Sequence, residues 1–163
     1  MKEITDYGKV FETLVEKTAK YLVDNNIKAQ ILGISGGIDS TVVAAICHEI
    51  SKRTNIPLIG RSLPTKFNKE GEISAANLVG KAFCDDFATF SIGNMYEDVL
   101  SEVTENSDKQ TALANGNIQA RLRMIYLYNL ASIHKGLVID TDNLTEHNLG
   151  YFTIHGDQGD VNP

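Results

Sequence analysis

A chain of 163 residues is long enough for one domain with a substantial core and short for two, so we expect a single domain over residues 1–163. Its 42% hydrophobic and 22% charged residues are typical of a globular protein, and no segment approaches the roughly 18 consecutive apolar residues of a membrane span. The net charge of −6 argues against nucleic acid as a partner, because repeated phosphate contacts need a basic surface. The N-terminal residues lack the apolar core of a signal peptide, so we expect a cytoplasmic protein without membrane contact.

The two cysteines and four histidines do not indicate a metal site. Cys47 and Cys84 lie within apolar helical patterns and lack metal-ligand spacing, so we expect buried, reduced thiols. The histidines show no such spacing either, and none of them is assigned a role.

The N-terminal third of the chain predicts a helix, a strand and a second helix. Residues 4–25 carry apolar side chains at helical spacing, which indicates one buried face. These apolar positions are Ile4, Tyr7, Phe11, Leu14, Val15, Tyr21 and Leu22. Residues 29–34 form a short β-branched run typical of a strand buried on both faces, and residues 42–52 have helical length.

Between this strand and this helix, residues 35–41 read Ser-Gly-Gly-Ile-Asp-Ser-Thr and indicate a phosphate-binding loop. Gly36 and Gly37 allow a positive φ and a close approach of the backbone to an anion. The start of the next helix offers unpaired N–H groups and the positive end of the helix dipole. Asp39 suits a phosphate that arrives with Mg²⁺. The hydroxyl donors expected here are Ser35, Ser40 and Thr41. Since the loop lacks the lysine of the Gly-x-x-x-x-Gly-Lys-Ser/Thr motif, a metal and backbone amides have to neutralise the phosphate.

The middle of the chain continues to alternate strands and helices. Residues 56–64 predict a strand closed by a proline, residues 70–83 a helix and residues 86–92 a third strand. The buried positions expected on this helix are Ile73, Ala76, Leu78 and Val79. Asn94 is expected to cap a helix over residues 95–103. The polar segments 65–69 and 104–109 are expected to be loops.

The longest helical pattern covers residues 110–135, and residues 137–139 predict a fourth strand. Much of the apolar surface of this helix is expected from Ile118, Leu122, Ile125, Leu130 and Ile133. Strands alternating with helices predict an α/β fold with a doubly wound, Rossmann-like parallel sheet that binds ligands at the carboxyl ends of its strands. Asp39, Ser62 and Thr141 follow predicted strands and are therefore candidate ligand contacts.

Residues 146–163 break this alternation, because they are rich in Gly, Asp, Asn and His and show little periodicity. A folded domain seldom ends in a long structureless segment that contains several aromatic residues. We therefore expect that the chain continues in the natural protein or that this end docks on a partner.

Four blocks of the sequence resemble those of the ammonia-dependent NAD synthetases, which belong to the ATP pyrophosphatases of the adenine nucleotide α-hydrolase-like group. They are Ser-Gly-Gly-x-Asp-Ser at 35–40, Gly-Asn-x-x-Ala-Arg-x-Arg-Met at 116–124, Thr-Asp-x-x-x-Glu at 141–146, and the segment 150–163. The first block alone indicates only the wider group, whereas the four in this order indicate the synthetases.

The resemblance implies a carbon–nitrogen ligase. In such an enzyme ATP adenylates the nicotinate carboxylate of deamido-NAD, pyrophosphate leaves, and ammonia attacks the acyl-adenylate. The resemblance also implies ATP and Mg²⁺ as cofactors, and a homodimer. It assigns the metal to Asp39 and Glu146, which together with the loop amides can stabilise the leaving pyrophosphate.

The same resemblance assigns the remaining site residues. Catalytic roles are implied for Asp39 and Asp157. The implied ATP-binding residues are Ile34, Ser35, Gly36, Gly37, Ile38, Asp39, Ser40, Thr41, Ser62 and Thr141. The implied substrate-binding residues are Asn117, Arg121, Tyr128, Tyr151, Asp157 and Asp160. Arg123 comes two residues after Arg121 and therefore falls on a different side of a helix. Its role is left open between a structural one, such as an ion pair, and a functional one.

The sequence departs from the pattern of these synthetases in three places. Ile154 and His155 stand where members often carry a lysine, and Ser62 stands where an arginine is common. Known members also continue for roughly a hundred further residues, in keeping with the usual size of such domains. We therefore expect this 163-residue chain not to complete the reaction efficiently by itself.

Two other functions remain open from the sequence. The chain could be another ATP pyrophosphatase, such as an amidotransferase subunit or a tRNA-thiolating enzyme, although the negative charge and the lack of a Cys-x-x-Cys pair argue against tRNA. A nucleotide-binding module without catalysis is the third hypothesis.

Overall fold

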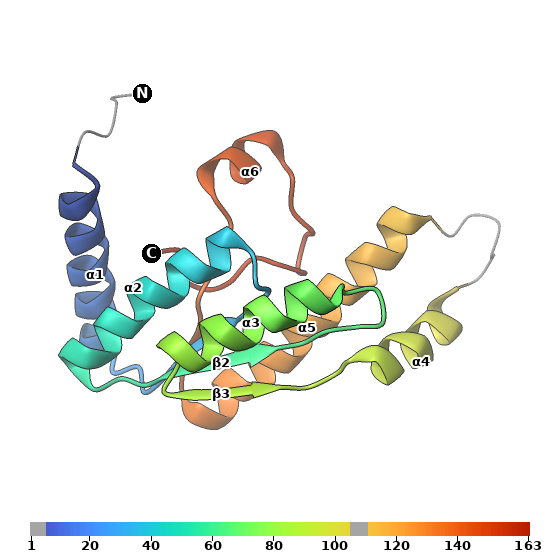
Figure 1. Cartoon of the computed structure of the whole chain (residues 1–163), viewed down its shortest axis with the longest axis horizontal. Coiled ribbons are helices and arrows are strands. Elements are labelled where there is room, and N and C mark those ends of the chain that lie inside the picture. Colours follow the sequence, from blue (N-terminus) through green and yellow to red (C-terminus); the bar gives the residue numbers. More distant parts are fainter. Residues whose placement is uncertain (1–5, 105–110) are drawn as a thin grey trace.

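The computed structural model describes residues 6–104 and 111–163, and Figure 1 shows the arrangement of their helices and strands. The centre is a parallel sheet of four strands in the order β3-β2-β1-β4. These strands are β1 (Gln30–Gly33), β2 (Leu58–Ser62), β3 (Asp86–Thr89) and β4 (Leu137–Val138). Because β4 returns to the far side of β1, the direction of winding reverses between these two strands. The predicted α/β class with a doubly wound parallel sheet is confirmed.

Helices cover both faces of this sheet. They are α1 (Tyr7–Asp24), α2 (Ile38–Thr54), α3 (Glu70–Phe83), α4 (Gly93–Val103), α5 (Ala112–His134) and α6 (Leu144–Leu149). Alternate residues of β1 point to opposite faces, so Ile31 packs with α4 and α5 whereas Leu32 packs with α2 and α3. Helix α1 packs on the outer side of α2, where Val15 and Ile46 belong to a third apolar cluster.

The helices differ from the sequence prediction mainly at their starts. Helix α2 begins at Ile38, four residues before the predicted start, because Gly37 in extended backbone serves as its N-cap. Asp39 therefore lies in the first turn of the helix and not in a free loop. The prediction that Asn94 caps the next helix is wrong, since α4 begins at Gly93 with Ile92 as its N-cap. Position 4 and residues 105–110 lie outside the described residues, so the predicted starts at 4 and 110 and most of the loop 104–109 are not described.

Several apolar side chains predicted to be buried are exposed. Leu78 of α3 is 73% exposed, because this helix buries Ala76 against the sheet on another side. On α1, Tyr7 and Tyr21 lie outside the face that buries Val15 and Leu22. On α5, Ile125 and Ile133, which were expected to carry part of the apolar surface of the helix, are exposed. Hydrophobic spacing identified these helices but did not fix the width of the buried face.

The strands are shorter than predicted, and the C-terminal segment is more ordered. Strand β2 ends at Ser62 and β3 at Thr89. Beyond β4, Ile139 pairs with Val161 in a parallel bridge, so the last residues extend the sheet. The expectation that residues 146–163 lack regular structure is wrong at their beginning, because α6 is held there by an Asn143 capping box.

Cys47 is buried, as predicted, whereas Cys84 is half-buried, and both are free thiols. Burial raises the pKa of both thiols, that of Cys84 to about 11. Within residues 6–104 and 111–163, no helix has the length and apolar character needed to span a membrane.

Candidate nucleotide site

The segment from Ser35 to Thr41, the phosphate turn, comprises the bend after β1 and the first four residues of α2, at the point where the winding of the sheet reverses. Gly36 has a φ of 86°, in the left-handed region that favours glycine. A Cβ at Gly36 would lie 2.5 Å from the Glu72 carbonyl oxygen and 2.9 Å from the Ala76 nitrogen, so α3 closes directly on this turn. No side chain of the described residues caps α2, which leaves its first N–H groups open to an anion.

The hydroxyl groups of the turn bond within the turn itself. The Thr41 hydroxyl donates to the Gly37 carbonyl oxygen at 2.7 Å. The Ser40 hydroxyl lies 3.1 Å from the same oxygen and 3.0 Å from the Ser35 hydroxyl. Ser35 also accepts from the Gly37 N–H at 3.1 Å. These bonds hold the turn in shape, and the backbone N–H groups are its main donors toward solvent.

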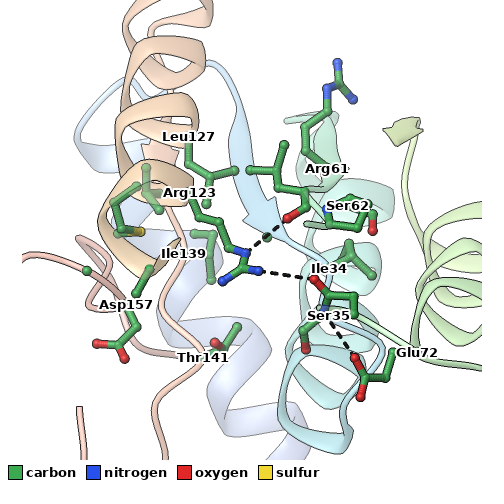
Figure 2. Close-up of a pocket in the computed structure, with 18 of the residues that line it drawn as sticks. Ile34, Ser35, Arg61, Ser62, Glu72, Arg123, Leu127, Ile139, Thr141 and Asp157 are labelled. Atoms are coloured by element: carbon green, nitrogen blue, oxygen red, sulfur yellow. Dashed lines mark hydrogen bonds between the residues drawn. The ribbon is translucent and has the colours of Figure 1, made fainter. Parts of the chain in front are cut away.

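Two cavities flank this turn and share Thr141 in their walls. The first, of about 330 Å³, lies between the ends of β1, β2 and β4 and one face of α5. Its walls include Ile34, Ser35, Ser62, Arg123 and Asp157, most of which Figure 2 labels. The second, of about 860 Å³, lies between α1, α2, α6 and residues 158–163, and Asp39 lines it. The turn therefore stands between a largely apolar cavity and a wider, acidic one that Asp39, Asp140 and Asp142 line.

Asp39 and Glu146, predicted as metal ligands, are brought together through one residue. The Asn143 side-chain amide donates to Asp39 Oδ1 at 3.4 Å, and the Asn143 backbone N–H donates to Glu146 Oε2 at 3.0 Å. Their carboxylates are hard oxygen ligands of the kind that Mg²⁺ prefers. In the described part of the chain, no group of three or more His, Cys, Asp or Glu residues could hold a metal ion. Two protein carboxylates fit a metal whose other ligands are phosphate oxygens and water.

Acidic side chains gather near this pair and affect one another's protonation. Burial, assisted by the charges of Asp140, Asp157 and Glu146, raises the pKa of Asp142 to about 6. Burial also raises the pKa of Asp157, although both of its carboxylate oxygens accept from the Thr153 N–H, at 2.8 and 3.0 Å. A cation or a proton in this region lowers the electrostatic repulsion among these groups.

The predicted substrate-binding residues lie along the contact between α5 and the C-terminal segment and do not share one cavity. Arg121 is exposed and donates to the Ile154 carbonyl oxygen at 3.3 Å. Asn117 accepts from the Thr153 hydroxyl at 2.9 Å, while Tyr151 is 75% exposed. Asp157 is the member of this set that lines the first cavity.

Tyr128 and Asp160, also predicted as substrate contacts, bond to each other. The Tyr128 hydroxyl donates to Asp160 Oδ1 at 3.0 Å, and the Val138 N–H donates to Asp160 Oδ2 at 3.0 Å. Burial and the adjacent carboxylate raise the pKa of Tyr128 to about 12. In this structure Asp160 fastens the C-terminal segment to β4 and α5.

The role of Arg123 was open from its sequence position, and the structure places its side chain in the wall of the first cavity. Its Nε donates to the Leu63 carbonyl oxygen at 3.1 Å, and Nη2 lies 3.5 Å from Asn68 Oδ1. Figure 2 shows it reaching from α5 toward the side of Ser35 and Glu72, while the guanidinium of Arg61 points away. The spacing of the wall residues on α5 was a usable signal, since they recur every three to four residues. These residues are Ala120, Arg123, Met124 and Leu127.

A turn at the reversal point of a parallel sheet, flanked by an apolar cavity and an acidic one, is the arrangement in which doubly wound α/β proteins bind their ligands. The model of the NAD synthase family matches residues 10–163, and the chain belongs to this family.

Individual relatives agree with this assignment. The chain is 35% identical over 159 residues to the NH₃-dependent NAD⁺ synthetase of Thermoplasma volcanium, covering 97% of this chain and 62% of the relative. It is 34% identical to the enzyme of the same name from Methanococcoides burtonii, covering 93% of this chain and 57% of the relative. This chain therefore spans less than two thirds of the length of these relatives.

Solved structures give the same result for the fold. The NH₃-dependent NAD synthetase of Campylobacter jejuni superposes with a TM-score of 0.87 at 28% identity, covering 98% of this chain and 67% of that one. The NMN synthetase of Francisella tularensis also gives 0.87, at 30% identity, with 98% and 65% covered. The adenine nucleotide α-hydrolase-like fold expected from the resemblance is thereby confirmed.

Proposed function

We propose that this chain acts in the ATP-dependent amidation of deamido-NAD by ammonia. A nicotinate carboxylate oxygen attacks the α-phosphorus of ATP and pyrophosphate leaves. Ammonia then attacks the acyl carbon, AMP leaves, and the proton lost by the nitrogen passes to a base. The observation that carries the proposal is the turn Ser35–Thr41, whose amides lie between two cavities in a chain of the NAD synthase family.

The roles proposed for the site follow from position. The adenosine part of ATP occupies the first cavity against Ile34 and Ser62, and Thr141 contacts the nucleotide where the two cavities meet. The amides that begin α2 hold the pyrophosphate as charge develops on it. Asp157 is the proposed base, because burial raises its pKa and so makes its carboxylate a better proton acceptor.

Magnesium belongs to the same proposal, with Asp39 and Glu146 as its protein ligands, on the ground that both contact Asn143. When bound, the metal would neutralise the triphosphate and polarise its oxygens. The chain's own contribution is to orient the two carboxylates, since Asn143 donates one N–H bond to each of them.

A homodimer is proposed as the assembly, supported by exposed apolar side chains on α5 such as Ile125 and Ile133. Clusters of exposed apolar side chains are unusual on a surface that stays in contact with water. A single domain over 1–163 and a cytoplasmic location without nucleic-acid contact remain predictions.

Isothermal titration calorimetry tests the proposal. The chain is titrated with ATP in the presence and absence of Mg²⁺, then with deamido-NAD, and pyrophosphate release is followed after both are mixed. Binding of both ligands supports a synthetase, and we expect it even if turnover is slow. Since the Francisella tularensis relative is named an NMN synthetase, the deamido form of NMN is titrated in parallel.

The outcomes separate the proposed synthetase from the other two hypotheses. ATP binding without deamido-NAD or its mononucleotide would support another ATP pyrophosphatase or a non-catalytic module. If ATP does not bind with Mg²⁺ either, the proposal is wrong.

A further inference from the structure

Arg123 brings a positive charge into the apolar cavity without an acidic partner there. Its bonds go to two neutral acceptors, the Leu63 carbonyl oxygen and the Asn68 side-chain oxygen. No ion pair within residues 6–104 and 111–163 includes it. Burial lowers the pKa of its guanidinium, which means that the surroundings do not compensate the charge.

The two carboxylates in the same wall have other partners. Glu72 accepts from the Asn68 side-chain amide at 3.1 Å and from the Lys69 N–H at 3.3 Å. Asp157 accepts from the Thr153 N–H. A guanidinium has five N–H donors, so most of those of Arg123 have no acceptor among these residues. Arg123 is half-buried, so its remaining N–H groups are open to a ligand that enters the cavity.

Arg123 therefore offers unpaired N–H donors and a positive charge to an anionic group in the cavity, and the nucleotide proposed to bind there carries one. The adenosine part has to lie along the apolar walls, and its 5′ end has to point toward Ser35 and Thr141, from which the phosphate turn begins. The phosphate that remains inside the cavity mouth is the one attached to the ribose. Figure 2 shows Arg123 directed toward this side of the cavity.

We propose that Arg123 contacts the α-phosphate of the bound adenine nucleotide, and so that it is a ligand-binding residue in addition to a brace for the end of β2. This inference rests on the proposed function, because it takes ATP, the acyl-adenylate and AMP as the ligands. Arg123 neutralises negative charge on this phosphate. The nicotinate carboxylate attacks the same phosphate, which later leaves as part of AMP.

The test compares AMP with adenosine, which differ only in this phosphate, by calorimetry in Mg²⁺-free buffer. We expect Arg123→Gln to bind AMP about 10- to 100-fold more weakly than the unmodified chain, which is the effect of losing a charged hydrogen bond, and to bind adenosine with unchanged affinity. Arg123→Lys keeps the charge and is expected to retain part of the preference for AMP. Arg53→Gln, an exposed arginine of α2 paired with Glu12 and Glu49, is the matched control and should change neither affinity.

Each other outcome contradicts the inference. If Arg123→Gln weakens adenosine and AMP equally while its circular dichroism spectrum is unchanged, Arg123 only shapes the cavity. If Arg123→Gln does not fold, Arg123→Lys decides. A preference for AMP over adenosine that is reduced but still present supports the phosphate contact, whereas a preference equal to that of the unmodified chain contradicts it. If the unmodified chain binds neither ligand, both this inference and the proposed function are wrong, which distinguishes that failure from a failure of Arg123 alone.

Discussion

Gly36 has no room for a side chain, because α3 lies against it. We expect Gly36→Ala to lower the free energy of unfolding by about 1–3 kcal/mol, since an alanine there is strained at a φ of 86° and its Cβ would approach the Glu72 carbonyl oxygen. Urea unfolding measures the change. Gly71→Ala is the control, because Gly71 lies in α3 with open space around it. This variant should raise the free energy of unfolding by up to about 1 kcal/mol.

Asp142 gives the stability of the chain a predictable pH dependence. Its pKa is about 6 in the fold and lower in the unfolded chain, so the folded state holds the proton more tightly. Stability should therefore fall as the pH rises from about 4 to about 6 and stay lower above that. Asp142→Asn should match the unmodified chain at pH 4 and be more stable at pH 7, by less than about 1 kcal/mol because solvent screens partly exposed charges. Thermal melts in EDTA at several pH values test this, and a constant difference at every pH would contradict it.

The sequence predicted some site residues because local chemistry determines them. The two glycines and Asp39 follow from what a phosphate turn requires, and Glu146 came from the resemblance. The meeting of Asp39 with Glu146 through Asn143 depends on contacts across more than a hundred residues, which no local pattern encodes. For Arg123 a signal existed in the spacing on α5, but a charged side chain usually lies on the exposed face.

Among the elements, α6 depends most on a single residue. The Asn143 side chain accepts from the N–H groups of Thr145 and Glu146, and the Glu146 carboxylate accepts from the Asn143 N–H. We expect Asn143→Ala to destabilise α6 by about 1 kcal/mol and to weaken Mg²⁺-dependent ATP binding, because Glu146 loses its position. Hydrogen exchange of the α6 amides and calorimetry measure the two effects.

Thr111→Ala supplies the matched control for this prediction. Thr111 caps α5 through a bond from the Ala114 N–H, so its loss costs a similar amount at an N-terminus away from Asp39. Equal losses of ATP affinity in both variants would show that Asn143 has no particular role at the site.

The extent of most elements could be predicted, and α3, β3 and β4 begin at the predicted residues, whereas the starts of α2 and α4 could not be predicted. Strand positions follow from short apolar runs, which is why all four strands overlap their predicted ranges. Helix α2 begins four residues early because an extended Gly37 serves as its N-cap, and α4 begins at an apolar residue, which the usual capping preferences disfavour. The capping box of α6 is visible in the sequence as Asn-x-x-Glu over residues 143–146, and it is a signal from which the start of this helix can be predicted.

For the whole molecule, Asp160 joins the last residues to the sheet and to α5. Asp160→Ala removes acceptors for both the Val138 N–H and the Tyr128 hydroxyl, so we expect the free energy of unfolding to fall by about 1–3 kcal/mol. Tyr128→Phe removes only one of these bonds and should cost less. Urea unfolding gives the order of the variants, and faster hydrogen exchange at Val138 in Asp160→Ala alone identifies the strand contact.

Because Thr141 belongs to the walls of both cavities, the shape of one cavity depends on the shape of the other. A ligand that moves Thr141 from one side alters the space on the other, and thermodynamic linkage makes this effect reciprocal. If a ligand in the apolar cavity changes the affinity of the acidic cavity by some factor, a ligand in the acidic cavity changes the affinity of the apolar cavity by the same factor. The order in which nucleotide and metal arrive then changes the path of assembly but not the total free energy of the filled site.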